Sequence, residues 1–187
     1  MSATMSAPSI QTLDPSGLDA NLDRLAEILH ACVSEGASIG FVLPFALDEA
    51  RAYWRGRVAP PLAAGGKLLL ATSRDHDLVA TAQIDFDSMP SKRHHAEVSK
   101  VLVDPRCRRL GLGRALMAEV ERRALAAGRW LLTLDTAGDA AEALYRSLGY
   151  ELAGTIPLYA RDAFGKDRYD ATRLMYKDLR GGRRFAP

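Results

Sequence analysis

The chain has 187 residues, of which 48% are hydrophobic and 26% are charged, a composition typical of a globular domain and not of a disordered or fibrous chain. A formal net charge of +2 gives no indication of a nucleic-acid or membrane partner. No signal-like segment begins the sequence, and no apolar stretch approaches the ~20 residues that span a membrane. We therefore expect a soluble cytoplasmic protein.

The first half of the chain predicts a strand, two helices and a hairpin. Apolar residues recur at three- and four-residue spacing before Gly36 and again before Pro60-Pro61, and glycine and proline commonly end such helices. Two apolar runs flank the turn-like segment RDHD and indicate antiparallel strands. In chain order we expect flexible residues 1–8, an edge strand at 9–13, helices at 15–36 and 47–58, and strands at 67–73 and 78–86.

The second half alternates strands and helices. Apolar residues repeat at i+4 spacing between Gly111 and Gly128, and a nearly all-apolar run from Trp130 suits the centre of a sheet. We expect strands at 96–103, 130–135, 150–156 and 172–176, helices at 111–127 and 139–148, and a basic flexible tail at 179–187. This order predicts an α/β fold, with a mixed sheet covered by helices, in a single domain over residues 9–178.

A glycine- and arginine-rich segment, RRLGLGRA at 108–115, separates the strand at 96–103 from the next helix. The first N–H groups of a helix lack partners, glycines let an anion approach the backbone, and arginines add charge, so the segment is suited to binding phosphate. A P-loop would require GK[ST], and a dinucleotide-binding turn would require a small residue where Leu116 stands. The alternative is a tight turn whose arginines are solvated.

Two motifs together give the chain a family resemblance. RRLGLG at 108–113 resembles the [QR]xxGx[GA] signature of the GNAT superfamily of acetyl-CoA-dependent N-acetyltransferases. LYRSLGY at 144–150 resembles the LYxxLG[FY] motif of the same family. The pair is much more specific than either motif alone.

Three further segments are similar to the tabtoxin-resistance branch of that family, whose acetyltransferase inactivates a β-lactam amino-acid toxin. These are GASIGF at 36–41, AEV at 96–98 with Lys100, and LDT at 134–136. The likeness extends over residues 25–178.

The resemblance implies a mostly antiparallel sheet whose fourth and fifth strands splay apart, with helices on both faces and the co-substrate acetyl-CoA between the two strands. It implies that Leu102 and Val103, at a strand edge, bind the pantetheine. The pyrophosphate would lie on the backbone of the turn formed by Arg108, Arg109, Leu110, Gly111, Leu112, Gly113 and Arg114. No metal is implied. Many members carry an asparagine where this chain has Gly138, so the chain departs from the pattern there.

The resemblance also assigns catalytic roles. Glu97 matches the general base that takes a proton from the acceptor amine, and Asp135 matches a second acidic residue that orients the substrate or shares the proton. Tyr145 matches the phenol that protonates the departing thiolate, and a backbone N–H near Leu102 would hold the oxyanion. Each side chain has a structural alternative: Glu97 could pair with Lys100 or an arginine, Asp135 could cap the next helix, and Tyr145 could pack in the core.

The acceptor side of the cleft is expected to include Ser38, Phe41 and Phe45, whereas Trp54 is expected in the core. The adjacent His94 and His95 would point to opposite sides of a strand, so we interpret them as a loop-exposed pair and not as metal ligands.

Together these features predict an N-acetyltransferase that moves the acetyl group of acetyl-CoA to a small amine, with an amino-acid-like β-lactam toxin or antibiotic as the favoured class. Two alternatives remain: a protein or peptide N-acetyltransferase, and a non-catalytic acyl-CoA-binding sensor. No nucleic-acid or membrane partner is expected. The resemblance alone suggests a homodimer.

Overall fold

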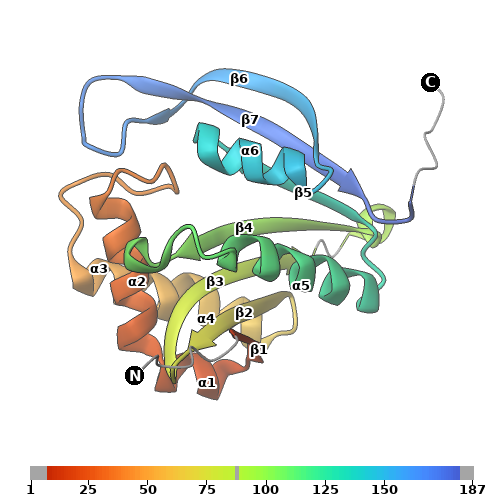
Figure 1. Ribbon diagram of the computed structural model, residues 1–187, viewed down its shortest axis with the longest axis horizontal. Helices are drawn as coiled ribbons and strands as arrows, with labels where there is room; N and C mark the ends of the chain where they lie inside the picture. The colour runs from red at the N-terminus through yellow and green to blue at the C-terminus, as the bar shows by residue number, and fades with distance from the viewer. Residues whose placement is uncertain (1–7, 87–88, 182–187) are drawn as a thin grey trace, which may run out of the picture.

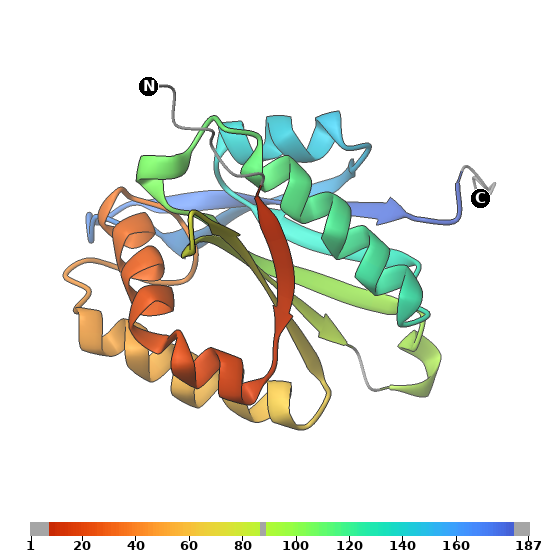
Figure 2. The same cartoon turned by 60° about the horizontal axis from the view of Figure 1, so that its bottom comes forward.

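The computed structural model describes residues 8–86 and 89–181, which form one seven-stranded sheet with helices on both faces (Figures 1 and 2). The strands are β1 Ser9–Leu13, β2 Lys67–Arg74, β3 Asp77–Phe86, β4 His95–Val103, β5 Leu131–Thr136, β6 Glu151–Arg161 and β7 Tyr169–Asp178. The helices are α1 Pro15–Ala20, α2 Leu22–Ser34, α3 Leu47–Tyr53, α4 Ala59–Ala63, α5 Leu112–Ala126 and α6 Asp139–Ser147. Of the segments predicted to be flexible, 1–7 and 182–187 lie outside the described residues.

Two hydrophobic clusters occupy the opposite faces of the sheet. One packs α1–α4 against the sheet around Leu29 and Trp54, both fully buried. The other packs α5 and α6 against the opposite face around Leu116. Neighbouring residues of β2 divide between them, Leu69 in the first and Leu70 in the second, because successive side chains of a strand point to opposite faces. The predicted mixed α/β fold with helices on both faces is confirmed. No helix in the described part of the chain has the length and hydropathy of a membrane span.

The centre of the sheet is split. The strand order is β1-β2-β3-β4-β5-β7-β6, and every neighbouring pair is antiparallel except β4 and β5. These two parallel strands pair only where His95–Glu97 lies opposite Leu131–Thr133. Beyond Glu97, β4 continues to Val103 with β3 as its strand partner. The predicted splay between the fourth and fifth strands is therefore confirmed (Figure 1).

The predicted helix at 15–36 is wrong in one respect, since it is two helices separated at Asn21. The backbone of Asn21 leaves the helical region, with φ −110° and ψ 13°. Its side-chain Nδ2 donates a hydrogen bond to the carbonyl oxygen of Gly17 at 2.7 Å. Asparagine commonly replaces helical hydrogen bonds with local ones, so a periodic apolar pattern can run through such a break.

The predicted end of the second helix at Pro60-Pro61 is also wrong. After α3 the chain passes through a π-helical turn, Trp54–Val58, directly into α4. Pro60 and Pro61 lie in the first turn of α4, where the backbone N–H groups have no helical partner to lose. The segment after Pro44 is thus a nearly continuous helical arm along one face of the sheet (Figure 2).

Candidate active site

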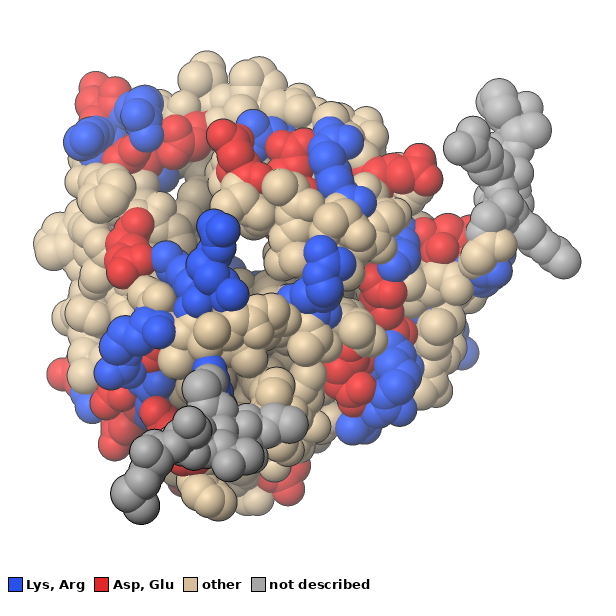
Figure 3. Space-filling view, viewed as in Figure 1, with Lys and Arg blue, Asp and Glu red and all other residues tan. Residues whose placement is uncertain are grey.

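The split between β4 and β5 leaves one edge of β4 open. Leu102 and Val103, predicted to bind pantetheine, lie on this stretch and pair only with Thr81 and Ala80 of β3. The N–H of Asp104 bonds to Val79 of β3, so the backbone groups of Val103 face the other way, toward the gap. The carbonyl of Val103 accepts a 3.5 Å hydrogen bond from Sγ of Cys32, and its N–H has no strand partner within the described residues. Figure 3 shows Lys and Arg side chains around an opening between α6 and the N-terminal end of α5.

The turn before α5 has the geometry of a phosphate-binding loop. Arg109 and Gly111 both have left-handed backbone angles, with φ 66° and φ 77°. Gly111 is the residue that precedes α5 and offers no side chain to cap it, so the first amides of the helix stay available to an anion.

The two glycines of the turn serve different purposes. A Cβ added at Gly111 would meet nothing within 4 Å, so its φ of 77° is what favours glycine there. At Gly113 an added Cβ would lie 3.2 Å from Cδ2 of Leu144 in α6. Gly113 therefore lies where α5 packs closely on α6, in addition to its expected place in the anion-binding turn.

The three arginines of the turn are not equivalent either. Arg108 forms a 2.6 Å ion pair with Glu35 at the end of α2, and Arg114 donates a 2.7 Å hydrogen bond to Ser147 of α6. Within the described residues, exposed Arg109 has neither a hydrogen bond nor an ion pair. Arg109 is therefore the arginine whose charge is most available to a phosphate.

Asp104, which sequence analysis did not single out, anchors the start of this turn. It is 2% exposed, and its carboxylate accepts hydrogen bonds from Arg24 at 2.6 Å and from Arg106 at 2.8 Å. It also accepts the backbone N–H of Arg106 at 2.9 Å. Hydrogen bonds from Arg106, then from Arg24, hold the pKa of Asp104 well below its usual range. Its spacing to Arg106 was visible in the sequence, but its burial was not.

Glu97 and Asp135 lie on the same face of the split sheet. Glu97 is opposite Thr133, two residues before Asp135 and on the same side of β5. Both residues keep part of their surface exposed to solvent. Partial burial raises the pKa of Glu97, and the negative charges of Asp85 and Asp135 raise it further. Glu97 has no hydrogen bond or ion pair within the described residues, so it is not the partner of Lys100 that the structural alternative required.

Asp135 does not cap α6. Its Oδ2 accepts a 3.1 Å hydrogen bond from the hydroxyl of Thr172 in β7. The residue before α6 is Gly138, which offers no side-chain cap. The carboxylate is thus held from the β7 side.

Tyr145 lies on α6 and is 7% exposed. Its ring packs at 5.8 Å from that of Tyr150, so the packing role considered from the sequence is also present. Burial, with a smaller contribution from the charge of Asp135, raises the pKa of Tyr145 to about 12. No hydrogen bond to its hydroxyl is made within the described residues, which leaves the phenol available as a donor.

A bulge in β4 places Lys100 in the same region. Ala96 and Val98 pack on the α5 side of the sheet, and so do Val101 and Val103. The side chains that face α5 thus change from even to odd positions between Val98 and Val101, as an extra residue in a strand requires. Lys100 has φ 49°, and the β3–β4 register shifts at the same place. The change from even to odd apolar positions can be seen in the sequence. The bulge geometry that directs Lys100 away from α5 cannot.

A buried polar network lies beside this bulge. Lys67, only 6% exposed, forms an ion pair with Asp85 and donates a 2.9 Å hydrogen bond to Oε1 of Gln83. The hydroxyl of Tyr53 is 3.2 Å from the same oxygen, and Ser99 bonds to Asp85 at 3.0 Å. No sequence motif indicates this network, because its members come from four separate elements.

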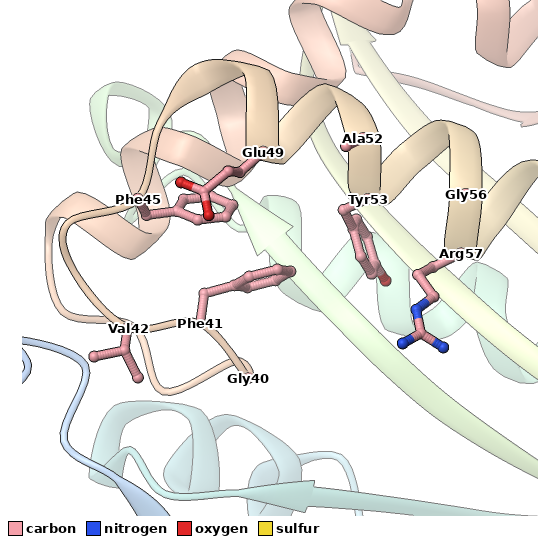
Figure 4. Close-up of a pocket in the computed structure, with 9 residues that line it drawn as sticks. All are labelled: Gly40, Phe41, Val42, Phe45, Glu49, Ala52, Tyr53, Gly56 and Arg57. Carbon is pink, nitrogen blue, oxygen red and sulfur yellow. The ribbon is translucent and has the colours of Figure 1, made fainter.

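A cavity of about 570 Å³ opens against the helical arm. Its lining residues are Gly40, Phe41, Val42, Phe45, Glu49, Ala52, Tyr53, Gly56 and Arg57. In Figure 4 the side chains of Tyr53 and Arg57 point from the helical arm toward the loop that carries Phe41, and the ring of Phe41 points back toward the helix.

Two of the three predicted acceptor residues, Phe41 and Phe45, thus line one cavity, whereas Ser38 does not. Tyr53 and Arg57 were missed, because sequence analysis considered only Trp54 in this helix. Trp54 is fully buried in the hydrophobic cluster, as expected.

His94 and His95 are not a loop-exposed pair, and that interpretation was wrong. His94 stacks on Trp130 with ring centroids 4.4 Å apart. His95 is the first residue of β4, and its Nε2 lies 2.7 Å from the hydroxyl of Thr133. Both are partly buried at the joined end of β4 and β5. Over residues 8–86 and 89–181, no group of three or more His, Cys, Asp or Glu side chains could hold a metal ion.

The loop that carries Gly138 is held by Arg173 of β7. Its guanidinium donates to the carbonyl of Ala137 at 3.0 Å and pairs with Asp139 at 2.9 Å. Arg173 thus holds the residues on both sides of Gly138. A Cβ added at Gly138 would meet nothing within 4 Å, so the usual asparagine could be accommodated.

Comparison with known proteins identifies the family. The model of the acetyltransferase (GNAT) family matches residues 22–150, which is more than half of the chain. The chain therefore belongs to the GNAT family of acetyltransferases.

Solved structures share the fold over nearly their whole length. The proposed acetyltransferase yncA of Salmonella typhimurium, solved with its cofactor acetyl-CoA, is 22% identical with a TM-score of 0.74, over 97% of this chain and 98% of that one. A ribosomal-protein-alanine N-acetyltransferase from Brucella melitensis is 28% identical with a TM-score of 0.73, over 91% and 99%. A proposed phosphinothricin N-acetyltransferase is 18% identical with a TM-score of 0.73, over 92% and 99%.

Proposed function

We propose that the protein is an N-acetyltransferase that uses acetyl-CoA to acetylate the amine of a small molecule. The observation that carries the proposal is the gap between β4 and β5, which has a phosphate-binding turn at one end and the carboxylates of Glu97 and Asp135 on one face. Family membership supports acetyl transfer. The similar yncA structure, which holds acetyl-CoA, supports this co-substrate.

The residues present fit acetyl-CoA. The uncapped first amides of α5 and the free guanidinium of Arg109 suit a pyrophosphate. The open edge of β4 at Leu102 and Val103 offers backbone groups to the amide bonds of a pantetheine. Bound there, acetyl-CoA supplies an activated acetyl group as a thioester.

Glu97 acts in this proposal as the general base. As the new C–N bond forms, the acceptor nitrogen loses a proton, and the carboxylate of Glu97 accepts it directly or through a water. Its raised pKa makes its carboxylate a better proton acceptor than that of an ordinary glutamate. Asp135, held by Thr172, orients the ammonium of the incoming acceptor.

Tyr145 assists the departure of the thiolate as the C–S bond breaks. A phenol with a pKa of about 12 stays protonated at any physiological pH, so it is always a donor. A thiol has a pKa of about 8.5, so complete proton transfer from Tyr145 to the thiolate is uphill. Its role is then a hydrogen bond to the developing negative charge, and water supplies the final proton.

The acceptor class follows from the cavity. About 570 Å³ suits a molecule of the size of an amino acid or a small antibiotic. The similar phosphinothricin N-acetyltransferase structure supports an amino-acid-like toxin or antibiotic, and the tabtoxin-resistance resemblance points the same way. The similar ribosomal-protein-alanine N-acetyltransferase favours the alternative of a protein N-terminus. We place the activity in the cytoplasm, where acetyl-CoA is formed.

The test measures CoA thiol release from acetyl-CoA across amino acids, phosphinothricin, β-lactam amino-acid toxins, aminoglycosides, polyamines and peptides. Turnover of small amines with none of peptides is the expected result. Turnover of peptides alone would establish the protein N-acetyltransferase instead. Tight binding of acetyl-CoA without turnover of any amine would identify a sensor.

A homodimer remains a proposal from the family resemblance. The hairpin of β6 and β7 at the sheet edge exposes large apolar side chains, with Leu158 74%, Tyr159 55% and Tyr169 51% exposed. Such side chains are compatible with a contact between two copies. Light scattering at micromolar concentration would give the mass, and a monomer mass would refute the proposal.

A further inference from the structure

Lys100 has no partner for its charge. It is partly buried, yet within the described residues its ammonium makes no hydrogen bond and no ion pair within 4 Å. Its neighbours are two aromatic rings, with Nζ 5.9 Å from the centroid of Phe41 and 5.8 Å from that of Tyr53. Charged groups removed from water are normally paired, so an unpaired lysine in a cleft is a candidate binding residue.

The position of Lys100 connects it to the acceptor. Phe41 and Tyr53 are also lining residues of the cavity, so the ammonium contacts the same aromatic wall that an acceptor would contact. Lys100 is also three residues after Glu97 on β4, on the stretch that leads from the proposed base to the open edge. The bulge directs the side chain of Lys100 to the side of the sheet opposite α5. At the bulge Lys100 has φ 49°, a left-handed backbone conformation that few residues other than glycine adopt.

Lys100 differs from the other lysine of this region. Lys67 is committed to Asp85 and Gln83, so its charge is already balanced. Burial lowers the pKa of Lys100, while the carboxylates of Asp135, Asp85 and Glu97 oppose that effect without touching it. An anion that enters the cleft could therefore pair with the ammonium of Lys100, which has no counterion within the described residues. Arg57, exposed and without an ion pair among the described residues, lines the cavity as a second cation.

We propose that Lys100 binds an acidic group of the acceptor, so that the substrate carries a carboxylate or a comparable anion in addition to its amine. The amine then lies toward Glu97 and Asp135, and the acid lies on Lys100 against the rings of Phe41 and Tyr53. Opposite charges at the two ends of the site would orient such an acceptor in one direction. This inference rests on the proposed function and adds a specificity-determining residue to it.

The test compares each acceptor with its neutral counterpart. CoA release is measured at pH 8.5 with L-amino acids and phosphinothricin, with the α-amides of the same amino acids, and with spermidine and tobramycin, which lack an acid. The wild type is expected to prefer an acid over its amide by about 10- to 100-fold in kcat/KM, the range that a charge-assisted hydrogen bond supplies. Lys100→Met should abolish that preference through KM for the acid while leaving the amide rate similar.

The acid-to-amide ratio separates binding from other effects of the substitution. If Lys100 merely supported the fold or the charge state of Glu97, Lys100→Met would slow the acid and its amide equally, which would overturn the proposal. Lys100→Arg keeps the charge and should retain part of the preference. Arg57→Gln, with Arg55→Gln as its exposed neighbour control, tests the other cation, and loss of the preference in Arg57→Gln alone would also overturn the assignment to Lys100.

The same panel keeps the two proposals distinguishable. Turnover of spermidine or tobramycin with none of the acids would refute the acidic acceptor and leave the N-acetyltransferase standing. Absence of turnover with every amine, despite measured acetyl-CoA binding, would count against the N-acetyltransferase itself.

Discussion

Glu97 offers the sharpest test of the chemistry at the scale of a single residue. Glu97→Gln removes the proposed base, so kcat/KM should fall by about 10²- to 10⁴-fold. Only the ionised carboxylate accepts a proton, so the wild-type rate should fall as the pH drops through the pKa of Glu97. Burial and the charges of Asp85 and Asp135 raise that pKa above its ordinary 4.5.

The pH profile of kcat/KM checks this directly. The acidic limb should be absent in Glu97→Gln and unchanged in Glu151→Gln, which alters an exposed glutamate at the start of β6. Persistence of the limb in Glu97→Gln would assign the base to another group.

Tyr145 and Tyr150 form a matched pair of buried phenols. Tyr145→Phe should lower kcat by about 10²-fold, the cost of one hydrogen bond to a developing charge, with little change in KM for acetyl-CoA. The hydroxyl of Tyr150 is buried without a partner in the described structure, so Tyr150→Phe should leave kcat unchanged and Tm unchanged or higher. Steady-state kinetics and thermal melts of both variants decide this, and equal losses of activity would reduce Tyr145 to a packing residue.

At the scale of elements, Asp104 joins α2 to the turn before α5. Asp104→Asn would remove the buried carboxylate that Arg24 and Arg106 share and leave the mostly buried guanidinium of Arg24 without it, which should cost about 3 kcal/mol of unfolding free energy. For a chain of this size, that predicts a fall in Tm of about 6–12 °C. Affinity for acetyl-CoA should fall as well, since Asp104 fixes the start of the turn.

A second aspartate provides the control. Asp178 binds Arg180 through the same pattern of side-chain and backbone hydrogen bonds, but it is more exposed and has no second arginine like Arg24. Asp178→Asn should therefore cost less than about 1 kcal/mol. The pKa of Asp104 is depressed, so its contribution is present above pH ~4 and is lost as the pH falls further, and the melting difference should narrow there. Equal melting losses in the two variants would contradict the role given to Asp104.

Helices and strands with a clear periodicity of apolar residues, or with a glycine at their end, were predictable from the sequence. Features that depend on contacts between distant residues were not. The hairpin, α5 and α6 follow from alternation, i+4 spacing and terminal glycines. The break at Asn21 and the helix through Pro60-Pro61 escaped, because local hydrogen bonds and first-turn prolines leave the periodicity intact. In the turn, Arg108 and Arg114 were expected on the ligand, but their partners lie 73 and 33 residues away in sequence. The change from even to odd apolar positions around Lys100 was readable in principle, whereas the polar network behind it was not.

At the scale of the whole molecule, the position of the gap between β4 and β5 predicts which backbone amides a bound co-substrate protects from hydrogen exchange. Saturating acetyl-CoA at 100 times its Kd should add about 2.7 kcal/mol of stability and raise Tm. Hydrogen exchange should slow at the amide of Val103, which faces the gap, and at the amides of residues 111–114, which open α5 without a side-chain cap. A rise in Tm without slower exchange at these amides would place the ligand elsewhere. The exposed surface of β1 and α1, far from the gap, serves as the internal reference.

The three-residue pairing of β4 with β5 also leaves the width of the gap free to change. The sheet consists of two plates, β1–β4 and β5–β7–β6, joined by strand hydrogen bonds only at His95–Glu97. A small rotation of one plate about that junction widens the far end without breaking any strand pair. The width there is governed by side chains that pack across the plates, such as Leu116 and Tyr145. Substitutions at apolar contacts such as Leu116, and not at the proposed catalytic residues, are therefore the simplest route by which this scaffold could change the width of the gap.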